Sequence, residues 1–600
     1  MGYQSLEECI NDLEKTGQLI RIKEEVDPNL EMATIHLKVF EAGGKAILFE
    51  NVKGSKYRAV SNVFGTLDRS KFLFRDTYEK VQDLVQLRNN PEKLFKKPWR
   101  FIRQGLHGLK AIPKKGNFNS AGFEEISISD LPQIKHWPMD GGAFITLPQV
   151  YSEDIDNPGI MHSNLGMYRI QLSGNDYKLN DEIGLHYQLH RGIGVHQYKS
   201  NKKGKPLKVS IFVGGPPSHT LAAVMPLPEG MSELAFAGVL GDRKFKYDYK
   251  DGFCISLDAD FVITGEVFPN DNKPEGPFGD HLGYYSLKHD FPVMKVHKVY
   301  AKKNGIWPFT VVGRPPQEDT AFGALIHDIS GNAIPKEIPG VKEIHAVDEA
   351  GVHPLLLAVG SERYTPYAET NRPSELLTQA SKILGTGQLS LAKYLFITGD
   401  NKKEINCHDI PAFLQYLFER IDFRRDLHFH TKTSIDTLDY SGEGLNEGSK
   451  VVFVAYGEKK RELTSDLSSF EKIGEAKLVF PGVVMLPFSS YTNSENAIKE
   501  IDKLISDLKS LNSISGFAQI VLCDNIEFGK DILKDYLWIT YTRSNPAIDI
   551  YGVNSFISNK HWGCEGPVII DARKKPHHAP ELILDKKVEE EADRILKLTN

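Results

Sequence analysis

The stretch that most limits the fold is Glu-Gly-Pro-Phe-Gly-Asp-His-Leu-Gly-Tyr-Tyr at residues 275–285. Pro277 and the glycines on either side of it exclude a helix, so Glu275 and Asp280 are predicted to lie on a tight loop. Strand-like runs before and after the loop would hold it firmly. A rigid loop with two acids suits proton transfer, and a surface turn with solvated acids is the alternative interpretation.

The chain around this loop changes character twice. Strand-like runs separated by Gly and Pro recur through residues 123–319, which favours a closed or split β-barrel over a doubly wound sheet. Residues 1–122 and 320–600 instead alternate helix and strand patterns and predict α/β domains, the second with two related halves. A helix predicted at 588–598 is expected to dock on its own domain or on a neighbouring subunit. The predicted fold class is therefore a multidomain α/β and α+β protein with a central split barrel, and the C-terminal domain is expected to mediate oligomerisation.

Composition excludes several classes of protein. A chain of 600 residues exceeds what one hydrophobic core supports, and a net charge of −6 argues against a nucleic-acid binder. The sequence shows neither an apolar run long enough to span a membrane nor a signal peptide. Its five cysteines are far apart and predict reduced thiols in a cytoplasmic protein.

An arginine interrupts the strand-like run Met-Tyr-Arg-Ile-Gln-Leu at residues 167–172. Strand alternation would place Met167, Arg169 and Gln171 on one face. A guanidinium in such a run is costly unless it is paired, and its fork suits a carboxylate or another anion. We therefore expect Arg169 to pair with an acid and an anionic ligand, while an ordinary salt bridge at the end of a barrel is the alternative.

A metal site is suggested by residues that are distant in sequence. His186 and His190 are four apart, as two ligands on a helix would be, but the Glu that follows the first His in zinc proteases is missing. Asn164 and Glu233 would complete, with His190, a set of one nitrogen and two oxygen ligands, which favours manganese or magnesium over zinc. The alternative for Glu233 is an acid in the first turn of a helix capped by Ser232.

The remaining motifs narrow the choice of cofactor. Two prolines keep residues 224–230 extended, so Met225 and Pro226 line a planar ligand or pack within a loop. The sequence has no dinucleotide-binding glycine pattern, no Walker loop and no Gly-x-Ser-x-Gly elbow. These absences weaken the dehydrogenase, nucleotidase and serine-hydrolase interpretations.

Together these motifs resemble those of the UbiD family of prenylated-FMN-dependent decarboxylases, which includes the ferulic acid decarboxylases. The resemblance spans about residues 5–400 and continues more weakly at 541–549 and 567–574. Five segments carry it in the order typical of the family: 164–169, 190–192, 225–233, 275–285 and 312–319.

The resemblance implies a domain organisation and a cofactor. It implies an N-terminal α/β domain (1–122), a central split-barrel domain that binds prenylated FMN (123–319) and a C-terminal α/β domain (320–600). The flavin would be modified by a UbiX-type prenyltransferase, and Mn²⁺, with K⁺ as an additional ion, would accompany it. The implied metal ligands are Asn164, His190 and Glu233. The residues implied at the flavin are Met167, Tyr168, Arg169, His186, Tyr187, Gln188, Arg191, Gly192, Met225 and Pro226.

The resemblance also implies a reaction. Arg169, paired with Glu275, would orient the substrate carboxylate, and Asp280 would supply the proton that replaces CO₂. The second acid is Asp, as in the polyprenyl-hydroxybenzoate branch, whereas the ferulic acid branch has Glu there, which disfavours a simple cinnamic acid. The expected function is non-oxidative decarboxylation of a hydroxybenzoate-like acid, polyprenylated or otherwise a quinone precursor.

Three alternatives stay open at this stage. They are a flavin-dependent oxidoreductase on the same barrel, a non-catalytic subunit of a phenol carboxylase complex, and the reverse reaction, carboxylation of a phenol. A homo-oligomer is expected, with peripheral membrane association if the substrate carries a polyprenyl tail. Residues 385–393 lie where some members contact the cofactor phosphate, and none of them is assigned that role.

Overall fold

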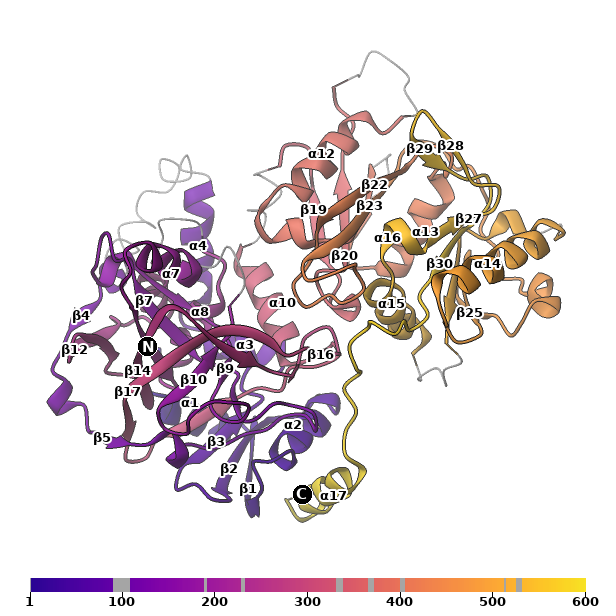
Figure 1. Ribbon diagram of the computed structural model, residues 1–600. Helices are drawn as coiled ribbons and strands as arrows, with labels where there is room; N and C mark the ends of the chain where they lie inside the picture. Colours follow the sequence, from indigo (N-terminus) through magenta and orange to yellow (C-terminus); the bar gives the residue numbers. More distant parts are fainter. Residues whose placement is uncertain are drawn as a thin grey trace. The chain divides into compact units, whose positions relative to one another are not determined.

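The computed structural model describes residues 2–89, 108–187, 192–227, 232–330, 338–364, 372–399, 405–511, 514–524 and 531–599. The chain forms two compact units (Figure 1), one of residues 1–331 and 581–600 and the other of residues 332–580. Within the described part of the chain, none of the helices is long and apolar enough to cross a membrane.

The first unit begins with a small α/β layer. Its elements are α1 (Leu6–Lys15), β1 (Leu19–Val26), α2 (Glu31–Glu41), β2 (Ala46–Val52), β3 (Arg58–Ser61), α3 (Leu67–Leu73) and α4 (Tyr78–Asn89), together with β18 (Ile306–Phe309). The strands form a sheet in the order β1-β2-β3-β18. The hydroxyl of Ser5 caps α1 by accepting the N–H of Glu8 at 3.2 Å, and the helix buries its apolar face as its spacing predicts. β18 comes from much later in the chain than the other strands and joins this N-terminal sheet beside β3.

A nine-stranded, strongly curled sheet forms the centre of the first unit. Its strands are β5 (Phe123–Ile126), β6 (Phe144–Ile145), β7 (Gln149–Glu153), β8 (Ser163–Gly166), β9 (Ile170–Gln171), β10 (Glu182–Leu185), β11 (Leu207–Val213), β14 (Phe261–Glu275) and β17 (His289–Lys302). They follow the order β6-β9-β10-β17-β14-β11-β7-β8, with β5 added on β17. Residues of β11 alternate between two cores, Val209 and Ile211 in one and Phe212 in the other. Both faces are therefore buried, and the path stays open as a half-barrel.

Further helices and short strands belong to the same unit as this sheet. They are α7 (Gly192–Lys202), α8 (Pro217–Val224), α9 (Glu233–Leu240), α10 (Glu318–Ser330), β4 (Lys114–Lys115), β12 (Lys246–Lys250), β13 (Phe253–Ser256), β15 (Phe278–Gly279) and β16 (Tyr285–Ser286). The last helix of the chain, α17 (Lys586–Thr599), also belongs to this unit and packs on α2 and β1 (Figure 1). Docking on the C-terminal domain, one of the two expectations for this helix, is therefore not what the structure shows.

The second unit contains two five-stranded sheets. The first uses β19 (Glu343–Ala346), β20 (Leu355–Gly360), α12 (Ser374–Leu384), β21 (Tyr394–Gly399), α13 (Ile410–Arg420), β22 (Leu427–Ser434) and β23 (Glu447–Ala455). The second uses β24 (Lys477–Phe480), β25 (Val483–Pro487), α14 (Ser494–Lys509), β26 (Gln519–Cys523), α15 (Ile532–Arg543), α16 (Pro546–Asp549), β27 (Ile550–Gly552), β28 (Phe556–Ser558), β29 (His561–Gly563) and β30 (Val568–Asp571). The two sheets follow the orders β19-β20-β21-β23-β22 and β24-β25-β26-β30-β27, with β28 and β29 as a separate hairpin.

Two local predictions near the acidic loop differ from the structure. The strand that precedes the loop is longer than expected, because β14 continues to Glu275, whose partner on β17 is His289. Only Asp280 lies in the turn between β15 and β16. Residues 167–169 lie between β8 and β9 instead of within one strand, because Met167 donates its N–H to Ala223 O of α8 at 2.9 Å and leaves the sheet ladder.

Candidate active site

Arg169 lies at the centre of a buried group of charges. Its Nε and Nη2 donate to the two carboxylate oxygens of Glu275 at 2.8 and 2.9 Å, and its Nη1 donates to Asp280 Oδ2. The side chain of Glu275 is fully buried, and those of Arg169 and Asp280 are 9% and 10% exposed. The sequence segments expected to carry the chemistry therefore meet, although 106 residues separate Arg169 from Glu275.

Three further groups hold the guanidinium in place. Nη2 of Arg169 also donates to Ser286 Oγ at 2.7 Å and lies 2.9 Å from Nδ1 of His186. The guanidinium carbon lies 4.7 Å from the centre of the Phe278 ring, within the range of a cation–π contact. Burial and the nearby guanidinium lower the pKa of His186, whose Nδ1 also lies 3.1 Å from Glu275 Oε2.

The charges set the protonation of the two acids. Burial by itself would raise the pKa of Glu275, but Arg169 and His186 outweigh burial and hold that pKa well below its ordinary value. The pKa of Asp280 is also lowered, because Arg169 and His281 together outweigh its burial. Oδ1 of Asp280 accepts from the backbone N–H of His281 at 2.7 Å and lies 2.9 Å from its Nδ1. Both acids are therefore ionised in this arrangement.

A second layer of residues fixes the loop that carries Asp280. Oδ1 of Asp140 accepts the N–H of Gly279 at 2.8 Å, and its Oδ2 accepts the N–H of Trp137 at 2.9 Å. The side chain of Asn175 donates to Gly276 O at 2.7 Å, while Gln171 Oε1 accepts the N–H of Gly276 at 2.9 Å. The backbone on both sides of the cis Gly276–Pro277 bond is thus hydrogen-bonded to side chains from outside the loop.

The described metal candidates Asn164 and Glu233 lie side by side. Glu233 is the first residue of α9, which Ser232 caps, and Glu233 Oε2 accepts the N–H of Leu165 at 3.4 Å. Burial raises the pKa of Glu233, and only backbone N–H groups oppose that rise among the described residues. A half-buried carboxylate with a side-chain amide nearby suits a hard cation, so these two residues fit the implied metal. His190, the third candidate, lies outside the described residues.

The described flavin candidates surround the same corner of the sheet. Tyr168 and Tyr187 are buried with ring centres 6.0 Å apart, and Met225 is buried at the end of α8. Gly192 lies so close to Asn164 that an added Cβ would come within 2.0 Å of its Oδ1. Pro226 is exposed, and Gln188 and Arg191 lie outside the described residues. A planar ligand with an anionic tail fits these residues.

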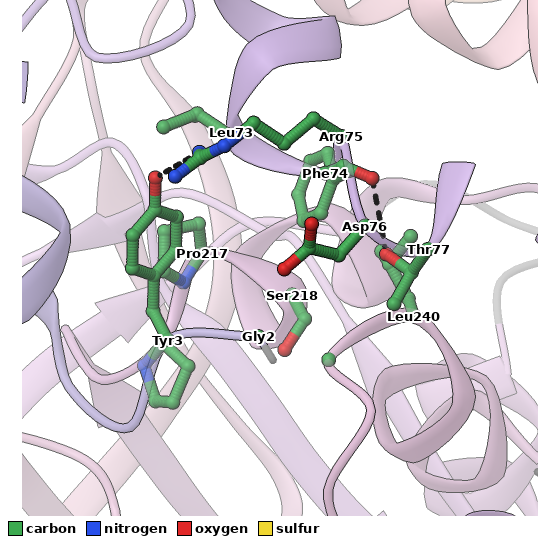
Figure 2. Close-up of a pocket in the computed structure, with 12 residues that line it drawn as sticks. Gly2, Tyr3, Leu73, Phe74, Arg75, Asp76, Thr77, Pro217, Ser218 and Leu240 are labelled. Carbon is green, nitrogen blue, oxygen red and sulfur yellow. Dashed lines mark hydrogen bonds between the residues drawn. The ribbon is translucent and has the colours of Figure 1, made fainter. Parts of the chain in front are cut away.

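Two cavities of the first unit are separate from this charged group. A cavity of about 20 Å³ lies where Tyr3 and Arg75 approach Pro217 and Leu240 (Figure 2), which leaves room for about one water molecule. A cavity of about 410 Å³ is lined by Tyr151, Ser210, Tyr249 and Cys254, among others. The lining of these two cavities includes none of the candidate site residues in the described part of the chain.

Sequence reasoning missed several residues that contact or brace the charged group: Asp140, Gln171, Asn175, Phe278, His281 and Ser286. Phe278 and His281 belong to the acidic motif at 275–285, but the motif alone assigns them no role. The Asp-Gly-Gly turn at 140–142 was a visible turn signal that gave no indication of its partner. Partners as distant as Asp140 and Gly279 are set by the fold.

Comparison with known proteins defines the class. Residues 10–88, 111–315 and 320–455 match, respectively, the N-terminal, Rift-related and C-terminal domains of 3-octaprenyl-4-hydroxybenzoate carboxy-lyase. The protein is therefore an enzyme of the carboxy-lyase type. The chain belongs to the UbiD family, as its motifs predicted.

Individual relatives agree with this assignment. A 4-hydroxybenzoate decarboxylase component of Chlamydia pneumoniae is 37% identical over 577 residues, 95% of this chain and 94% of the relative. The fold is similar to that of the vanillic acid decarboxylase of Sedimentibacter hydroxybenzoicus in its closed form (TM-score 0.63, 21% identity, 84% of this chain and 99% of that chain). It is also similar to an evolved dimeric form of HmfF from Pelotomaculum thermopropionicum in complex with prFMN (TM-score 0.56, 20% identity, 79% and 99%).

Proposed function

We propose that this enzyme removes CO₂ from a hydroxybenzoate-like aromatic acid without net oxidation or reduction, with prenylated FMN as cofactor and Mn²⁺ as the associated ion. The observation that carries the proposal is the buried guanidinium of Arg169, held by both carboxylates of the acidic motif. Support comes from the carboxy-lyase family and from the names of its relatives, one a component of a hydroxybenzoate decarboxylase and one solved with prFMN.

The chemistry explains why a cofactor is needed. Loss of CO₂ from an aromatic acid leaves an electron pair on an sp² carbon, which no side chain can delocalise. Prenylated FMN supplies the electron sink when it is bound. The protein must then bind the carboxylate, exclude water and deliver a proton, and these are tasks for buried charged groups.

Arg169 is suited to bind the substrate carboxylate. Glu275 takes Nε and Nη2 in a two-point contact and fixes the plane of the guanidinium, which leaves Nη1 as the position where a second anion competes with Asp280. A substrate carboxylate at Nη1 would separate Asp280 from the guanidinium. Because burial alone raises the pKa of Asp280, that separation would favour its protonated form.

Asp280 is therefore the proposed proton donor to the carbon that loses CO₂. Without substrate, Asp280 is ionised and paired with Arg169. Binding of the substrate carboxylate would therefore favour uptake of a proton by Asp280. The same residues would also serve the reverse reaction, carboxylation, and the concentrations of CO₂ and product would set the direction.

The residues that would hold the cofactor follow from the same corner of the sheet. Asn164 and Glu233, with His190, would hold the ion beside the flavin phosphate, and Tyr168 and Tyr187 would flank the ring system. A homo-oligomer supplied with its flavin by a UbiX-type prenyltransferase is part of the proposal. A cytoplasmic location, with its reducing conditions, fits the five buried free thiols.

Co-expression with a UbiX-type prenyltransferase tests the proposal. We expect a bound ligand with the mass and absorbance of prenylated FMN, and CO₂ release from at least one acid in a panel of hydroxybenzoates and naphthoates with and without polyprenyl tails. Bleaching of the flavin by a reduced nicotinamide with no CO₂ release would instead identify an oxidoreductase. An enzyme that stays free of flavin and releases no CO₂ would point to a non-catalytic subunit.

A further inference from the structure

The second unit is built from two halves with the same topology. Apart from α16 and the β28–β29 hairpin in the second half, each half runs strand, strand, helix, strand, helix, strand, strand, and the two sheets have the corresponding orders β19-β20-β21-β23-β22 and β24-β25-β26-β30-β27. Across both sheets the neighbouring strands pair antiparallel, parallel, parallel and antiparallel. Agreement in order, direction and connection indicates that the halves repeat one fold.

Residues at matching positions confirm the repeat. Asp426 directly precedes β22, and Asp549 directly precedes β27, and both are buried. Asp426 Oδ2 accepts the N–H of Asp422 at 2.9 Å, and Asp549 Oδ2 accepts the N–H of Asn545 at 2.7 Å. In each half, therefore, an aspartate accepts the N–H four positions before it and fixes the turn that leads into the edge strand.

The helix before this turn shows the same spacing. An arginine lies six residues before the aspartate in each half, Arg420 in the first and Arg543 in the second. A leucine lies twelve residues before it, Leu414 and Leu537, and both leucines are buried. Identical spacing of Leu, Arg and Asp is a sequence trace of the repeat, and it agrees with the two related halves expected from the alternating helix and strand patterns.

The two halves share a buried polar interface. The hydroxyl of Tyr394, at the start of β21, lies 2.6 Å from Ser544 Oγ, just after α15. The rings of Tyr394 and Tyr541 are 5.0 Å apart, and all three residues are fully buried. The contact between the halves is therefore closely packed and includes a side-chain hydrogen bond that solvent does not reach.

The interface is reciprocal. Ser449, near the start of β23, bonds to Asn545 and accepts the N–H of Ala547 at 2.8 Å in the turn after α15. In the opposite sense, Cys564, which follows β29 and lies four residues before β30, donates its N–H to Phe423 O at 3.1 Å in the turn after α13. In each half, the chain at the start of the fifth strand or shortly before it thus lies against the turn after the second helix of the other, as in an isologous pair of subunits.

We propose that residues 477–571 are a second copy of the fold formed by residues 343–455, and that this copy occupies, within one chain, the self-association face that a single-copy chain offers to another chain. The family's C-terminal domain matches only as far as residue 455, where the first copy ends. The vanillic acid decarboxylase chain aligns over 99% of its own length but over only 84% of this chain, so this chain has additional residues. The partner of the first copy is thus covalently attached, and any oligomer of the full chain uses other surfaces.

A pair of engineered cysteines tests this proposal. The Ser449→Cys/Asn545→Cys double variant of the full chain is oxidised mildly and run without reductant, beside wild-type protein, whose five thiols are buried. We expect a disulfide within one chain, seen as a faster band at the mass of a single chain and lost on reduction. A covalent dimer, or no disulfide at all, would overturn the proposal.

Mixing two single variants gives an independent measurement. Chains with Ser449→Cys alone are mixed with chains with Asn545→Cys alone and oxidised in the same way. We expect no mixed dimer, because each interface is already closed within its own chain. A mixed dimer would show that the copies exchange between chains. Thermal unfolding of both single variants checks that each chain is folded.

Discussion

Arg169 and Glu275 form a two-point ion pair of 2.8 and 2.9 Å between the corner that follows β8 and the last residue of β14. The pair is buried, so the attraction between its charges is screened little by solvent, and each charge would be costly without the other. Asp280 takes the remaining edge of the guanidinium. Stability of the site and its proposed chemistry thus depend on the same three side chains.

Asp280→Asn should lower CO₂ release by about 10²–10⁴-fold, because asparagine cannot supply the proton and positioned acids contribute this much. Cofactor absorbance should be retained, since Arg169, the flavin candidate that Asp280 contacts, keeps its two hydrogen bonds to Glu275. Asp290→Asn changes an exposed acid on β17 and serves as the matched control with near-normal turnover. Full activity of Asp280→Asn would remove this residue from the mechanism.

Arg169→Leu should lower the free energy of unfolding by about 3–5 kcal/mol, since it leaves two buried carboxylates without their counter-charge. Urea unfolding measures the change. Arg58→Leu is the control, because Arg58 pairs with Glu7 at the surface and such pairs contribute about 0–1 kcal/mol. The double variant Arg169→Leu/Glu275→Gln should lose less stability than the two single losses added together. Simple additivity would mean that the two residues act independently.

Stability should fall in acid in a way that depends on Glu275. Its pKa is lower in the folded protein than in the unfolded chain, where a Glu titrates near about 4.3. The stabilisation is therefore fully present above that pH and is lost as the pH falls toward the folded-state pKa. The gap between the urea midpoints of wild type and Glu275→Gln, measured from pH 7 to pH 3, should be constant at higher pH and begin to narrow below about pH 4. A gap that stays constant with pH would contradict the assigned ion pair.

Asp140→Asn should lower kcat more than it changes KM. The amide replaces one acceptor oxygen by a donor that faces backbone N–H groups, so the turn at Gly279 should shift and move Asp280 away from Arg169. A displacement of about 1 Å can cost up to about 10²-fold in rate. The control is Asp176→Asn at an exposed position. Equal effects on kcat and on thermal stability in both variants would leave Asp140 with no positioning role.

Glu233→Gln should weaken Mn²⁺ binding by at least about tenfold, because the neutral amide is a poorer ligand and removes a charge from the site. The affinity is measured by Mn²⁺ titration with electron paramagnetic resonance, which needs no turnover. Glu266→Gln on β14 is the control, with wild-type affinity expected. Unchanged affinity in the Glu233 variant would place the ion elsewhere.

Some features of the candidate site could be predicted from the sequence, and others depend on the fold. The Gly-Pro-Phe-Gly run predicted a turn flanked by two acids. Arg169, in an otherwise uncharged strand-like run, indicated that a counter-charge must lie nearby in the fold. The contacts that hold the loop could not be predicted, because the partners are far apart in the sequence. Asp140 accepts the N–H of Gly279, 139 residues later, and Asn175 donates to the carbonyl of Gly276, 101 residues later. Strand limits were also misjudged, because the pairing of Glu275 with His289 on β17 extends β14 past the point where local pattern ends.

The sequence by itself determined the family, the candidate charged residues Arg169, Glu275 and Asp280, and the helices whose apolar spacing is regular, since these depend on residue type and local periodicity. Tertiary structure alone decided which oxygen of each acid meets which nitrogen of Arg169, and which turns brace the loop. It also supplied the equal strand orders that support the two related halves expected from the sequence. The physical reason is that strand pairing and side-chain contacts join residues that are distant in the sequence, so residue type and local periodicity do not determine them.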